Sequence, residues 1–83
     1  MSGGYFNYEE RRLETIAEKL REAVNNAQER GLSDRTVREF KRALRLVEHT
    51  YAYLHRIDYF LSADDSEETF HEQLLIDLLK IEL

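Results

Sequence analysis

Four arginines recur at helical spacing near the middle of this 83-residue chain, and they are the residues best suited to bind a partner. At roughly 100° per residue they lie within about a quarter-turn of one another, and no acidic residue lies inside their line. Guanidinium groups bind phosphates and carboxylates through paired hydrogen bonds, so the line indicates a surface for an anion. Continued along the same helix, the predicted binding surface comprises Arg35, Arg38, Arg42, Arg45, His49, Tyr53, Arg56 and Phe60.

A second interpretation uses the chain's own glutamates. Glu10, Glu14, Glu18 and Glu22 follow one another at four-residue spacing in the first predicted helix. They could face the arginines within one chain or between two subunits. Exposed ion pairs of this kind contribute little energy each, so they would fix the orientation of the helices more than their stability. The sequence leaves both interpretations open.

Catalytic and metal-binding patterns are weak. Glu68 and His71 form one E-x-x-H motif, whereas a di-iron bundle needs two such motifs and two further inward-facing glutamates. The chain has no cysteine, and no serine has a base beside it in the sequence, so no activated nucleophile is evident. We therefore predict a protein that is not an enzyme and that uses neither a metal nor a cofactor.

Composition narrows the class of partner. Seventeen acidic residues oppose twelve basic ones, which argues against general nucleic-acid binding. The first residues lack the apolar run of a signal peptide, and nowhere do eighteen apolar residues follow one another. The absence of cysteine fits a reducing compartment. These features predict a soluble cytoplasmic protein without a membrane partner.

The chain has little that would interrupt helices. It has no proline, and its glycines are Gly3, Gly4 and Gly31. Gly31 followed by Leu32 is typical of a helix end, and Ser33 can cap the next helix. We expect one all-α domain over residues 1–83, with residues 1–4 disordered. Helices are predicted at about 6–30, 34–61 and 66–82, the first two as a long antiparallel hairpin and the third packed across it.

Apolar side chains at both ends of the chain predict a homo-oligomer. Three aromatic residues precede the regular part of the first helix, and the third helix has a wide apolar face. A chain this short cannot cover both surfaces with its own core. The predicted oligomer interface comprises Tyr5, Phe6, Tyr8, Phe70, Leu74 and Leu78.

The segment from Arg56 to about Leu79 resembles small helical proteins encoded in tailed-phage and prophage genomes. Those proteins typically show R-x-D, a few apolar residues, S-G-D-D-G-E, S-F-H and a leucine-rich end. In this chain Ala63 and Ser66 replace the two glycines. The family carries no settled activity. The resemblance implies a phage origin, action in the host cytoplasm and a role against host defence.

Together these features predict a small, non-catalytic phage accessory protein. In the leading hypothesis a homo-oligomer sequesters an anionic nucleotide signal on the arginine-lined helix face. In one alternative the same face docks on an acidic host protein and inhibits it. In another the chain is a purely structural or assembly module.

Overall fold

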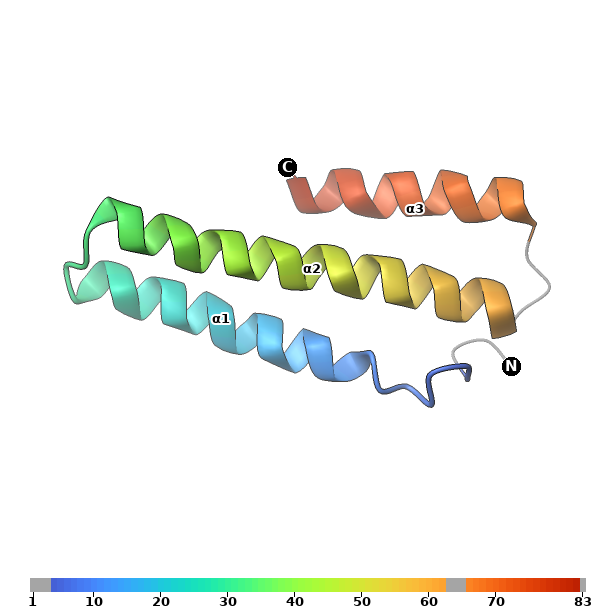
Figure 1. Ribbon diagram of the computed structural model, residues 1–83, viewed down its shortest axis with the longest axis horizontal. Helices are drawn as coiled ribbons and strands as arrows, with labels where there is room; N and C mark the ends of the chain where they lie inside the picture. Colours follow the sequence, from blue (N-terminus) through green and yellow to red (C-terminus); the bar gives the residue numbers. More distant parts are fainter. Residues whose placement is uncertain (1–3, 63–65, 83) are drawn as a thin grey trace.

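The computed structural model describes residues 4–62 and 66–82. Within these ranges it contains helices α1 (Arg11–Glu29), α2 (Asp34–Ser62) and α3 (Glu67–Glu82) and no strand. α1 and α2 form a long antiparallel hairpin, and α3 folds back along the second half of α2 (Figure 1). The predicted all-α fold is confirmed. α3 packs on α2 and not on α1, so α2 is the central element.

The hairpin turn follows from its local sequence. Gly31 takes a φ of 74°, the left-handed conformation that glycine adopts without a steric penalty. The N–H of Leu32 then donates to the Ala27 carbonyl at 3.1 Å, as in a Schellman ending. Ser33 Oγ accepts the N–H of Thr36 at 3.3 Å and caps α2. The two helices are therefore fixed antiparallel by signals that all lie within about ten residues.

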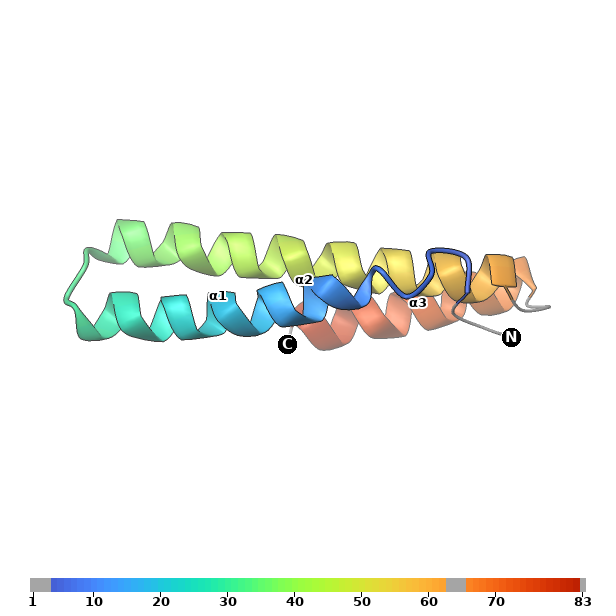
Figure 2. The same cartoon turned by 90° about the horizontal axis from the view of Figure 1, so that it is seen from below.

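The contact between α1 and α2 is built from small side chains. The buried apolar residues of the described chain are Ala17, Val24, Ala27, Val37 and Ala52. These side chains let the two helices approach closely, but none of the chain's leucines, isoleucines or phenylalanines is fully buried in the described ranges. The molecule is a narrow slab of 49 × 23 × 12 Å, and Figure 2 shows this elongation from a second side. Its radius of gyration is 15.3 Å, against about 12 Å for a compact domain of this length.

The start of α1 differs from the prediction. The sequence placed it at about residue 6, whereas residues 4–10 form turns and α1 begins at Arg11. Asn7 and Tyr8 have φ values of 54° and 63°, which cannot continue a right-handed helix. Of the segment predicted to be disordered, residues 1–3 lie outside the described ranges, and the Gly4 carbonyl accepts the Asn7 N–H at 3.2 Å.

α3 begins close to its predicted position. Ser66 Oγ accepts the N–H of Thr69 at 3.1 Å and caps the helix. The preceding corner, residues 63–65, lies outside the described ranges. None of the three helices, as described, combines the length and the apolar character needed to cross a membrane.

Candidate functional site

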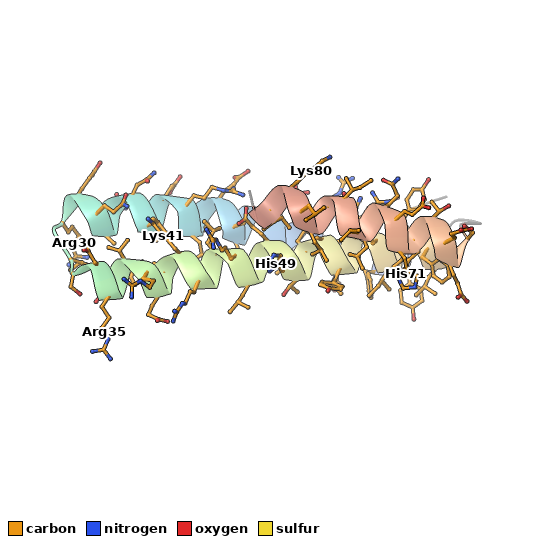
Figure 3. The ribbon with its side chains drawn as sticks, turned by 90° about the horizontal axis from the view of Figure 1, so that it is seen from above. Arg30, Arg35, Lys41, His49, His71 and Lys80 are labelled. Atoms are coloured by element: carbon orange, nitrogen blue, oxygen red, sulfur yellow. The ribbon has the colours of Figure 1, made fainter. Side chains whose placement is uncertain are left out.

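The first half of α2 carries an exposed arginine surface, defined here as Arg35, Arg38, Arg42 and Arg45. At 1.5 Å per residue it is about 15 Å long. Arg42 Nη1 lies 2.8 Å from Glu39 Oε1, one turn earlier on the same helix. The other three guanidinium groups have no carboxylate within 4.0 Å among the residues that the structure describes. Arg35 projects away from all three helices (Figure 3).

This surface is open because α3 is shorter than α2. α3 has 16 residues and α2 has 29. α3 starts beside the C-terminal end of α2 and runs back along it, so it ends near the middle of α2 (Figure 1). The face that carries the arginines continues beneath α3, where the Phe60 and Phe70 rings lie 5.3 Å apart. The arginine surface is therefore the part of this face that lies beyond the end of α3.

The second half of the predicted binding line has a different role. Arg56 Nε donates to Asp77 Oδ2 at 2.8 Å, and Phe60 is half-buried against α3. Both residues contact α3 within the chain, and a contact of either one with a partner stays a prediction. His49 is half-buried and already interacts with another group of the protein. It lies on α2 near the end of α3 (Figure 3). Tyr53 remains exposed on the flank of the line.

The interpretation as an internal ion-pair seam receives no support from the described contacts. Among the described residues, the one ion pair that joins α1 to α2 in this region has its arginine on α1 and its glutamate on α2. Arg21 Nη2 lies 2.9 Å from Glu48 Oε2. Glu10 is buried near the other end of the hairpin, and Glu14 bonds to Tyr51. None of the four surface arginines contacts the line from Glu10 to Glu22 within the described residues.

A buried acidic site at the open end of the hairpin was not predicted from the sequence. Asp58 is fully buried, and its Oδ1 accepts the backbone N–H of Tyr5 at 2.8 Å and the hydroxyl of Ser62 at 3.0 Å. Burial alone would raise the pKa of Asp58. The hydrogen bonds from Tyr5, Ser62 and Glu10, together with nearby His55, hold that pKa below its ordinary value of 3.8.

Glu10 completes this site. Its side chain is also buried and lies within hydrogen-bonding reach of Asp58. Glu10 Oε2 and Asp58 Oδ2 have no N–H or hydroxyl donor in the described structure. Burying two carboxyl groups side by side is costly unless hydrogen bonds or nearby charges compensate them. The two groups form an acid pair that is buried at this end of the hairpin.

Beside the acid pair is a cavity of about 460 Å³ at the junction of the N-terminal segment, α1 and α2. Its charged groups already have partners within the chain. The Arg11 guanidinium lies 5.1 Å from the Tyr8 ring centre, and Arg56 lies 5.5 Å from that of Tyr59. Burial and the hydrogen bond to Glu14 raise the pKa of Tyr51 to about 12. We therefore interpret the cavity as a structural feature and not as a ligand site.

Among the described residues, the single E-x-x-H motif is not part of a larger donor cluster. Glu68 and His71 are both exposed on α3. Within the ranges 4–62 and 66–82, no group of three or more His, Cys, Asp or Glu side chains is placed to hold a metal ion.

The predicted oligomer-interface residues divide into two groups: Tyr5 and Tyr8 are exposed, whereas Phe6, Phe70, Leu74 and Leu78 are half-buried. The N-terminal aromatic segment is anchored to α2 through the Tyr5 N–H, and Phe6 packs edge-to-face on Tyr5. Phe70 contacts α2, and the two leucines four and eight residues later lie on the same side of α3. The large apolar residues that α3 exposes are three others, Leu75, Ile76 and Leu79, and the assignment of Phe70, Leu74 and Leu78 to an oligomer interface stays a prediction.

Comparison with protein-family models, with curated proteins and with solved structures found no match to this chain. Any function therefore has to be inferred from the residues of the chain itself.

Proposed function

We propose that the protein is a non-catalytic binding protein whose arginine surface docks on an acidic protein. The observation that carries this proposal is the open cluster itself. Four guanidinium groups repel one another along one helix face, and three of them have no carboxylate partner in the described structure. A helix that needed only solubility would gain from alternating charges, and this chain has an excess of acids to supply them.

The shape of the surface favours a protein over a small ligand. The arginines lie along one exposed helix for about 15 Å, and Arg38 and Arg45 line two different cavities instead of a common one. An acidic helix or extended segment can place carboxylates at matching intervals, and each guanidinium can bind a carboxylate through two hydrogen bonds. A nucleotide on this surface would stay open to water unless a second subunit covered it. Nucleotide sequestration, with a role against host defence, is therefore the competing hypothesis in the test.

The experiment compares three proteins as bait in a bacterial lysate: the wild type, Arg38→Ala/Arg42→Ala, and Arg12→Ala/Lys19→Ala. The last pair is the control because both residues are exposed on α1 without an ion pair in the described structure. Arg21 is unsuitable as a control because it binds Glu48. We expect an acidic protein to be retained by the wild type and the control and lost with Arg38→Ala/Arg42→Ala.

The retained protein is then purified and its affinity measured by calorimetry. Each lost arginine should weaken binding about tenfold or more, because a charge-assisted hydrogen bond contributes about 1.5–3 kcal/mol. Equal capture by both variants would contradict the proposal. Thermal stabilisation of the pure protein by a cyclic dinucleotide, abolished in Arg38→Ala/Arg42→Ala, would favour nucleotide sequestration instead.

A further inference from the structure

α3 is apolar on two opposite sides. Phe70 packs on the Phe60 ring of α2, and at about 100° per residue Leu74 and Leu78 lie on that inner side. Leu75, Ile76 and Leu79 point the other way and are 59%, 43% and 53% exposed. A helix that is apolar on both sides is typically buried between two neighbours. α2 is one such neighbour, and the described residues of the chain provide no second neighbour on the outer side of α3.

The chain also exposes more surface than a stable monomer of its size. Its accessible surface is 6341 Å², whereas a monomeric protein of 9.9 kDa exposes about 5,200 Å². The excess is about 1,100 Å², and a standard interface buries about 800 Å² on each partner. The excess area is therefore similar to the area that contact with one further protein would bury.

We propose that a second copy of this chain covers the outer face of α3, with the two α3 helices antiparallel about a two-fold axis near Ile76. The charges on α3 favour this occupant. Glu72 and Lys80 lie four residues on either side of Ile76, and both are exposed. An antiparallel pair therefore brings each Lys80 level with Glu72 of the partner subunit, whereas a parallel pair places like charges together.

Two features are compatible with such a dimer. Lys80 is exposed and projects away from α2 (Figure 3), at the edge of a cavity that Glu14 and Glu18 of α1 also line, so its long side chain can still reach a neighbouring subunit. α3 ends near the middle of α2 (Figure 1), so the arginine surface on the first half of α2 lies outside the proposed contact. The dimer therefore does not depend on the proposed function, and each can fail without the other.

Cysteine cross-linking of the full chain tests the two-fold axis directly, because the native sequence has no cysteine. Ile76→Cys places two thiols on opposite sides of the proposed axis, and mild oxidation should convert most of the protein to a covalent dimer. Leu46→Cys is the control, since Leu46 is 66% exposed on α2 and lies away from this face. Equal cross-linking of the two variants, or none with Ile76→Cys, would overturn the proposal.

Sedimentation equilibrium supplies an independent measurement. The wild type should be dimeric at micromolar concentration, and Leu79→Glu should raise the dissociation constant about 100-fold or more, because each dimer contains the change twice. Lys80→Glu should weaken the dimer, and adding Glu72→Lys should restore it. Circular dichroism checks that each variant stays helical. A wild type that is monomeric at 100 μM would overturn the proposal, and failure of the charge exchange to restore the dimer would overturn the antiparallel arrangement.

Discussion

The backbone N–H of Tyr5 lies 2.8 Å from Asp58 Oδ1, and this contact joins two residues 53 positions apart. It holds the segment before α1 against the last turns of α2. The hairpin is thereby closed at the end opposite Gly31. The acceptor is a fully buried carboxylate, whereas the buried apolar residues of the described ranges are alanines and valines. Much of the order at this end of the molecule therefore depends on one polar group.

Replacing Asp58 with alanine should lower the free energy of unfolding by about 1–3 kcal/mol, because the Tyr5 N–H loses its charged acceptor and keeps only the Ser62 hydroxyl, 2.9 Å away. The N-terminal segment should detach first, so trypsin should cleave faster at Arg11 and Arg12. Urea unfolding and timed proteolysis measure the two effects. Glu9→Ala, at a neighbouring exposed position, is the control and should change neither. Unchanged cleavage in Asp58→Ala would show that the anchor does not order the segment.

Glu10→Gln should leave stability at neutral pH unchanged or raise it by up to about 1 kcal/mol. The introduced amide N–H can donate to the Asp58 carboxylate and so keep the hydrogen bond that Glu10 makes there. Glu10→Ala should instead destabilise the protein by about 1–3 kcal/mol, because the buried Asp58 loses that hydrogen bond. Thermal unfolding of the two variants at pH 7 measures the difference. A marked loss of stability in Glu10→Gln would show that a hydrogen-bonding side chain at position 10 is not sufficient.

The hairpin was predictable because its signals are local. Gly31, Leu32 and Ser33 fix the turn by their own conformational preferences, and the apolar spacing fixes which sides of α1 and α2 face each other. The start of α1 was not predictable in this way. The segment before α1 is anchored to Asp58, 53 residues after Tyr5, and leaves the helical conformation at Asn7 and Tyr8. Nothing in the sequence between 5 and 10 indicates that partner.

The candidate site was predicted in part for a related reason. Helical spacing placed the arginines, Arg56 and Phe60 on one face of α2, which the structure supports. Spacing on one helix cannot show where a second helix ends, and the length of α3 decides which of these residues are exposed. The same limit applies to α3. The apolar residues on both of its sides recur at helical spacing. The sequence alone therefore did not show that Leu78 faces α2 while Leu79 faces outward.

Tyr51 should ionise near pH 12, because burial and the hydrogen bond to Glu14 favour its neutral form. A raised pKa in the folded state means that this contribution to stability is complete below pH 10 and is lost as the pH rises from 10 to about 12. Absorbance titration should show a late tyrosine step that is missing in Tyr51→Phe. Thermal stability should fall less steeply over this interval in Tyr51→Phe than in the wild type. Identical pH profiles would place the late-ionising group elsewhere.

The Arg56–Asp77 ion pair should contribute more to stability than the Arg42–Glu39 pair, although both have a separation of 2.8 Å. The side chains of the first pair are 18% and 25% exposed, and those of the second are 65% and 61% exposed. Asp77→Ala leaves a largely covered guanidinium without its partner, so it should cost about 1–2 kcal/mol after allowance for partial solvent screening. Glu39→Ala should cost less than about 0.5 kcal/mol, because an exposed pair contributes little.

Amide hydrogen exchange locates the effect of Asp77→Ala. If this ion pair fastens α3 to α2, amides of α3 should exchange faster in the variant while those of α1 keep their wild-type rates. Arg56→Leu/Asp77→Leu should recover much of the lost stability, because an apolar contact replaces the pair without leaving a buried charge. Equal losses in Asp77→Ala and Glu39→Ala would show that the covered pair is no stronger than the exposed one. In that case the packing of Phe60 on Phe70 holds α3 in place, and Phe70→Ala should release it.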